Sequence, residues 1–166
     1  MAFSAPATSL LIDPVVGSGG LTTTGSATAP ETGSLAGAII RTRDGRRFQQ
    51  VKNDSSGVAI AAAGAPVVWQ LTTTDYVITP DISDNPGVGF AGVACAVITD
   101  TYWGFIQTKG KCNARVSGNV TAGDALYVTN DGYFDAATVG THHVVAVALT
   151  TASPTEGAGF ADIMLM

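Results

Sequence analysis

Apolar and polar residues alternate in short runs through the second half of the chain, and Gly, Asn or Asp residues separate the runs. An alternation of period two is typical of strands, because successive side chains point to opposite faces of a sheet. No window shows convincing helical periodicity. The pattern predicts an all-β fold, either an antiparallel β-sandwich or a β-barrel. The predicted strands are 93–99, 102–108, 111–116, 124–128, 132–135, 143–150 and 158–166.

The first third of the chain divides into an arm and a hairpin. Residues 1–34 are rich in Ala, Ser, Thr, Gly and Pro and contain no Lys or Arg, which predicts an extended N-terminal arm. Such an arm is either a flexible tail or a segment that becomes ordered on a partner. We expect one β domain at 35–166, with a possible internal boundary at the Pro- and Gly-rich loop 80–91.

Residues 37–52 predict a β-hairpin, because two strand-like runs flank Asp44-Gly45. Asp-Gly is a strong signal for a two-residue turn. With that turn, Arg43 lies opposite Arg46, and Arg41 lies opposite Phe48. Like charges directly opposite each other are mildly destabilising.

The chain is poor in charge, and its charge is unevenly distributed. Charged residues make up 13% of the sequence, whereas soluble domains typically contain about 25%. A surface so poor in charge predicts burial against copies of the chain or against a large partner. The net charge is −5, yet the stretch 41–52 carries five basic residues against the single acid Asp44; they are Arg41, Arg43, Arg46, Arg47 and Lys52.

This basic stretch has two open interpretations. It is either a solvated hairpin tip or a docking contact to an acidic protein surface, for which Arg is well suited because it binds carboxylates through two hydrogen bonds. The rest of the chain holds twelve acids and three basic residues, so it would repel a phosphate backbone. We therefore expect no nucleic-acid partner.

Candidate catalytic and ligand-binding motifs are weak. Residues 87–92 (GVGFAG) match a dinucleotide-binding pattern, but a strand-like run follows where that motif requires a helix. His142 and His143 are neighbours on a predicted strand and would face opposite sides. Two reduced, buried thiols are favoured over a disulfide for Cys95 and Cys112. We expect no catalytic residue, no cofactor and no metal ion.

Export and membrane insertion are not expected either. The sequence starts without the basic region of a secretory signal, and it contains no apolar run of about 18 residues. These features predict a protein that is made in the cytoplasm, with no membrane partner.

Three segments together resemble the decoration (cement) proteins on the heads of tailed bacteriophages. They are residues 103–114 (WGFIQTKGKCNA), 118–132 (GNVTAGDALYVTNDG) and 144–149 (VVAVAL), followed by the closing apolar strand at 157–166. The resemblance spans residues 92–166. The arm and the Arg-rich hairpin do not take part in it.

The resemblance implies a non-enzymatic structural protein of the virion. Its partner would be the major capsid protein on the exterior of the phage head, which the protein would stabilise, often as a homotrimer. The low charge and the apolar terminus place the trimer interface on Ile163, Met164, Leu165 and Met166. The alternative is a trimeric, β-rich tail-fibre or receptor-binding module.

Overall fold

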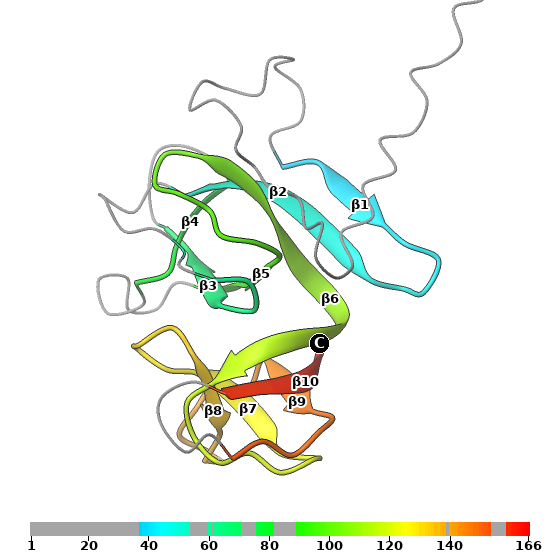
Figure 1. Cartoon of the computed structure of the whole chain (residues 1–166), viewed down its shortest axis with the longest axis vertical. Helices are drawn as coiled ribbons and strands as arrows, with labels where there is room; N and C mark the ends of the chain where they lie inside the picture. The colour runs from blue at the N-terminus through cyan, green and yellow to red at the C-terminus, as the bar shows by residue number, and fades with distance from the viewer. Residues whose placement is uncertain are drawn as a thin grey trace, which may run out of the picture.

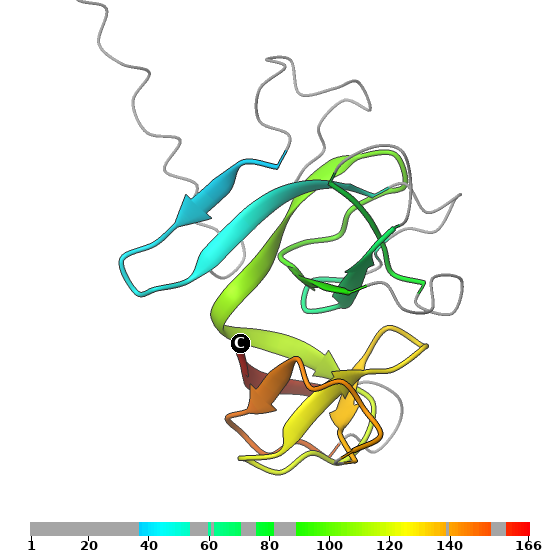
Figure 2. The same cartoon turned by 180° about the vertical axis from the view of Figure 1, so that it is seen from behind.

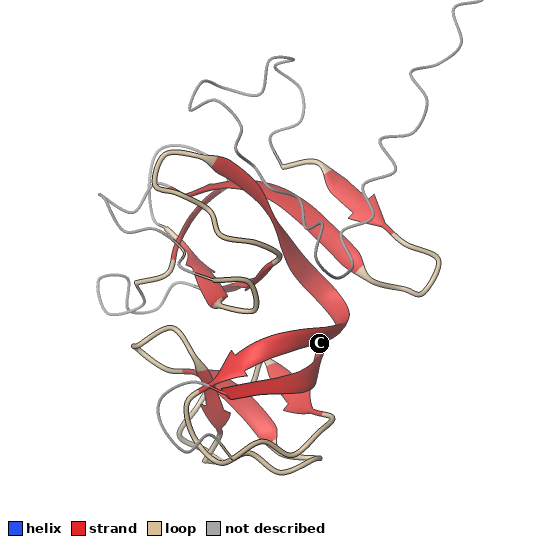
Figure 3. Ribbon diagram, viewed as in Figure 1, coloured by secondary structure: helices blue, strands red, loops and turns tan. Residues whose placement is uncertain are grey.

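The structure is a computed structural model that describes residues 37–53, 60, 62–70, 76–81, 89–138, 140–153 and 159–166. The predicted arm at 1–34 lies outside these residues. All regular structure in the described part is strand, as Figure 3 shows, which confirms the predicted all-β class. The described part contains no helix that is long and apolar enough to cross a membrane.

The described residues form ten strands, most of them short. In chain order they are β1 (Ile39–Arg41), β2 (Arg47–Asn53), β3 (Pro66–Trp69), β4 (Val77–Thr79), β5 (Phe90–Ala94), β6 (Trp103–Val116), β7 (Ala125–Val128), β8 (Phe134–Ala136), β9 (Ala146–Ala148) and β10 (Gly159–Leu165).

The strands close into two five-stranded rings that share β6. One ring runs β2-β4-β3-β5-β6 and returns to β2, and the other runs β6-β10-β9-β7-β8 and returns to β6. We call them the first and the second barrel; they are the upper and lower lobes of Figures 1 and 2. A ring with an odd number of strands cannot be antiparallel throughout. Each barrel accordingly has one parallel pair, β2 with β4 and β6 with β8.

Each barrel encloses its own apolar core. The first is filled by side chains that include Val51, Val67, Ile78 and Ile106, all fully buried. The second is larger and is lined by residues that include Leu126, Phe134, Ile163 and Leu165. Inward-facing residues of a small barrel fill its interior completely, so neither interior is an open channel.

The two barrels are packed against each other. Val93 of β5 belongs to the core cluster of the second barrel, and the ring of Phe90 meets that of Phe134 edge-on at 5.9 Å. The backbone N–H of Arg115 donates to the carbonyl of Gly64 at 2.9 Å. The predicted internal boundary at 80–91 falls between β4 and β5, which are both strands of the first barrel, and residues 82–88 lie outside the described residues. The strand that passes from one barrel to the other is β6.

The strand β6 corrects the prediction of separate strands at 102–108 and 111–116. Gly110 lies between them with a φ of +92°, and it bends the strand without ending it. The side-chain amide of Gln107, which is buried, donates to the carbonyls of Lys109 and Lys111 at 3.1 and 2.9 Å. Gln107 therefore satisfies two backbone acceptors on either side of the bend.

The hairpin forms as predicted, but its register is shifted by one residue. Arg41 pairs with Arg47 and Ile40 with Phe48, so the predicted pairs Arg43–Arg46 and Arg41–Phe48 are wrong. The loop has three residues, 43–45, because Gly45 N donates to Thr42 O and Thr42 N donates to Arg46 O. Gly45 takes a φ of +85°, as the last residue of a three-residue hairpin loop often does.

The C-terminal strand corrects the expected interface in part. Ile163 and Leu165 point into the second barrel and are 0% and 2% exposed, so they are core residues of the protomer itself. Alternation along β10 places Met164 on the outer face, where it is 40% exposed, and Met166 is 66% exposed. Only these two of the four predicted residues are open to a partner.

We expect Gly110→Ala to destabilise the fold more than Gly123→Ala does. Both glycines have similar φ values, +92° and +98°, which cost an L-residue about 1–2 kcal/mol. A Cβ at residue 110 would also lie 3.2 Å from the Cα of Arg46, whereas one at residue 123 meets nothing within 4 Å. Urea unfolding of the two variants checks this, and equal losses would show that the bend tolerates a side chain.

Candidate functional site

Three cations from three adjacent strands form a row beside the hairpin. Arg41 of β1 pairs with Arg47 of β2, and Arg47 pairs with Lys109 of β6. Residues directly opposite each other in antiparallel strands project on the same face. Arg41 and Lys109 are exposed and Arg47 is half-buried. We call Arg41, Arg47 and Lys109 the basic row.

A β-bulge brings Lys109 into this row. The register between β2 and β6 shifts after the first pair, so that Arg47 faces Lys109 while Phe48 faces Gln107. Thr108 is the extra residue; in a regular register, with no bulge, Arg47 would face Thr108. Bulges often redirect a side chain in this way. The Thr108 hydroxyl accepts a hydrogen bond from Arg47 Nε at 2.8 Å and donates to Arg47 O at 3.3 Å, which fixes both the bulge and the guanidinium.

Arg46 is neutralised within the hairpin. Its Nε and one terminal nitrogen both lie 2.6 Å from Asp44 Oδ2. The Thr42 hydroxyl donates to the other carboxylate oxygen, and this hydrogen bond together with Arg46 holds the pKa of the Asp44 carboxyl below its usual range. Asp44 thus neutralises Arg46. No described acid neutralises the three cations of the basic row.

A pocket of about 270 Å³ opens over the basic row, lined by Arg41, Thr42, Gly45, Arg46, Arg47 and Lys109. A second cavity of about 610 Å³ adjoins it and shares Gly45, Arg46 and Lys109 with it. In that second cavity Lys111 forms an ion pair with Asp162 at 2.8 Å, and Asn113 donates to the same carboxylate at 3.2 Å. These two contacts lower the pKa of Asp162.

The structure separates the predicted docking residues. Arg43 is exposed at the hairpin tip and does not line the pocket. Lys52 lies five residues along β2 from Arg47, about 16 Å away, and pairs with Val77 and Trp103 instead. Lys109 was missed because it is distant in sequence, and only the pairing of β2 with β6 brings it to the hairpin.

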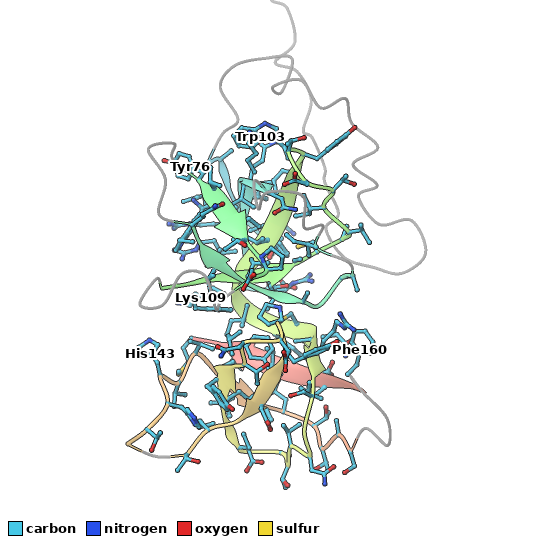
Figure 4. The ribbon with its side chains drawn as sticks, turned by 90° about the vertical axis from the view of Figure 1, so that its left-hand side faces the viewer. Tyr76, Trp103, Lys109, His143 and Phe160 are labelled. Atoms are coloured by element: carbon cyan, nitrogen blue, oxygen red, sulfur yellow. The ribbon has the colours of Figure 1, made fainter. Side chains whose placement is uncertain are left out.

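A second candidate surface is the outer face of β9 and β10. Phe160, Leu149 and Met166 are 54%, 39% and 66% exposed, and Met164 lies beside Val147 on the same sheet. In Figure 4 Phe160 and Lys109 project from opposite sides of the waist between the barrels. Phe160 therefore faces away from Lys109, whereas Met164 lines the cavity that also contains Arg46 and Lys109.

The histidines do not lie on a strand as predicted but in the segment that leads to β9. His142 stacks on Tyr127 with ring centroids 3.8 Å apart, and its Nδ1 accepts a hydrogen bond from Thr138 N. His143 is exposed. Among the described residues no group of three or more His, Cys, Asp or Glu could hold a metal ion.

The glycine-rich motif leads into a strand. β5 begins at Phe90, within residues 87–92, so the helix that a dinucleotide site requires does not follow. Cys95 and Cys112 are free thiols, and burial raises the pKa of each to about 12.

We expect both thiols to react slowly in the folded protein. A thiol pKa of about 12 leaves very little thiolate at pH 8, whereas an unfolded cysteine with a pKa of about 8.5 is substantially ionised. The higher nucleophilicity of the buried thiolates offsets only part of this difference. Alkylation by iodoacetamide at pH 8 should be more than about tenfold slower in buffer than in urea. Equal rates would contradict the raised pKa values of these two thiols.

Comparisons with known proteins find distant structural likenesses among solved structures. The sequence matches no protein family and no curated protein. The structure is similar to the N-terminal base of the head fibre gp8.5 of bacteriophage phi29, with a TM-score of 0.48 and 13% sequence identity. The match covers 72% of this chain and 92% of that one. With similarity this low, function is inferred from the residues of this chain.

Proposed function

We propose that this chain is a decoration (cement) protein of a tailed-bacteriophage head. It binds the outer surface of the capsid, stabilises the lattice and catalyses no reaction. The resemblance of residues 92–166 to such proteins supports this proposal, and these residues build β5 to β10. Closed barrels suit a structural protein of the phage head, because they leave few strand edges open to unwanted pairing with other chains.

The basic row is the observation that carries the proposal. Three like charges on neighbouring strands repel one another, a cost to the fold that a carboxylate-bearing partner would relieve. The rest of the sequence is acidic, so the row makes the charge of the protein uneven, and this asymmetry would orient it on an acidic capsid surface. The partner we propose is the major capsid protein.

The apolar outer face of β9 and β10 is the proposed homotrimer interface. It replaces the four-residue interface predicted from sequence with Leu149, Phe160, Met164 and Met166, all of them exposed. Exposed apolar side chains gathered on a protein surface commonly mark a contact between proteins, and here Asp162, paired with Lys111, lies between Phe160 and Met164. Phe160 projects away from Lys109, so a trimer that closes through Phe160 would keep its basic rows free for the capsid.

The Arg41→Glu, Lys109→Glu double variant should bind empty expanded capsids at least about tenfold more weakly than the wild type, because it reverses two of the three charges in the row. Co-sedimentation with capsids measures the affinity. Lys52→Glu is the control. It changes the charge by as much as each single substitution of the double variant, but it lies at the other end of β2. Binding that depends on Lys52 and not on the row would contradict the proposed surface.

Replacing Leu149, Phe160 and Met166 by Ser should convert the trimer into folded monomers. These side chains are exposed in the protomer, so the barrels should survive while the association loses its apolar contacts. Light scattering gives the mass, and circular dichroism confirms the fold. Ile39→Ser is the control, because Ile39 is 52% exposed but lies on β1. A wild-type protein that is monomeric at micromolar concentration would refute the trimer.

The alternative function, a receptor-binding module of a tail fibre, has one observation in its favour. Tyr76 and Trp103 lie together at the end of the first barrel in Figure 4, and both are next to Lys52 in the sheet. Tyr76 is 40% exposed. If the protein binds host cells but not capsids, and if Tyr76→Ala abolishes that binding, this alternative replaces the decoration role.

A further inference from the structure

We infer that the pocket over the basic row binds an extended acidic segment of a partner protein, one with carboxylate side chains at alternate positions. The inference rests on the proposed function in one respect: the capsid is taken as the source of that segment. The site is the pocket of about 270 Å³, with Arg41, Arg47 and Lys109 as the cations that meet the ligand.

The geometry of the row sets the spacing of the ligand. Arg41, Arg47 and Lys109 occupy directly paired positions on β1, β2 and β6. Neighbouring strands lie about 4.8 Å apart, so the row spans roughly 10 Å across the sheet. In an extended segment, side chains on one face repeat about every 6.6–7 Å. Two carboxylates at alternate positions therefore fit within the row when the segment crosses the strands, whereas three would span about 13–14 Å and exceed it.

The side chains of the basic row favour the carboxylates of a short acidic segment over the phosphates of a nucleic acid. An arginine held by a fixed contact presents its guanidinium in one orientation, and Arg47 is held in this way by Thr108. A nucleic-acid duplex would extend beyond the pocket over a body with twelve acids and three basic residues outside the hairpin stretch. A short acidic segment can bind in the pocket without contacting the acidic remainder of the protein.

Asp44 acts as an internal competitor for the same site. Its carboxylate is the only acid on the hairpin between Ile39 and Asn53, and it occupies Arg46 at the edge of the pocket. Removing this charge frees Arg46 for the ligand. Asn in its place keeps the turn, because Asn-Gly and Asp-Gly both favour hairpin loops. Asp44→Asn should therefore strengthen binding, the opposite of what a merely structural role predicts.

The test uses the full chain and a fluorescent seven-residue peptide with glutamate at alternate positions, followed by anisotropy at low salt. The Arg41→Glu, Lys109→Glu variant should lose at least about tenfold in affinity, and Asp44→Asn should gain about two- to fivefold. Thr108→Val should lose affinity because it frees Arg47, while Thr108→Ser should keep it. Lys52→Glu should bind as the wild type does.

Three results would overturn the inference. They are equal binding of a glutamine version of the peptide, tighter binding of a short DNA duplex than of the peptide, and no effect of the double variant. Co-sedimentation with capsids separates this inference from the proposed function. If the peptide binds but capsids do not, the decoration role fails and the pocket stands. If capsids bind through the row but the peptide does not, the decoration role stands and the inference fails.

Discussion

Everything in this fold depends on the continuity of β6 through its bend. The strand supplies one side of both barrels, and its two ends are buried in different cores while its middle is exposed. Only a residue that accepts a positive φ can turn the strand there without breaking its pairing, and Gly110 does so. The buried amide of Gln107 donates to the carbonyls on either side of the bend and so ties the two halves of the strand together there.

The bend also explains where the basic surface lies. The hairpin packs against the middle of β6, and the bulge at Thr108 comes just before Gly110. A regular strand would place Lys109 on the opposite face from Arg47, because side chains alternate. One inserted residue thus changes a scattered set of cations into a row. Repulsion among these cations destabilises the fold, and contacts with carboxylates of a partner would compensate for it.

The sequence predicted those elements that depend on local pattern. The strand at Ala125–Val128 and the C-terminal strand lie close to where the alternation placed them, because a half-buried strand shows its period directly. β6 was divided in two because glycine between strand-like runs usually marks a turn. The hairpin register was wrong by one residue because Asp-Gly also occurs in three-residue loops, where only Gly takes the positive φ.

The features that were missed all need contacts between distant residues. No local signal joins Lys109 to Arg47, since the register of β2 on β6 and its bulge decide the pair. Ile163 and Leu165 were expected at an interface because they are apolar near the end of the sequence. Alternation alone cannot say whether the buried face of such a strand meets a partner or, as here, the protomer's own core.

The shared strand has a consequence for synthesis on the ribosome. β2, β3, β4 and β5 all precede β6, so the first barrel can close as soon as β6 emerges. The second cannot, because Gly159 of β10 pairs with Val116 of β6, and β10 must enter between β6 and β9. Until then the emerging half of β6 carries unpaired backbone groups and an apolar face. The strand order therefore lets the first barrel close before the second, and this half-closed state is the one that exposes an unpaired strand and an apolar face to other chains.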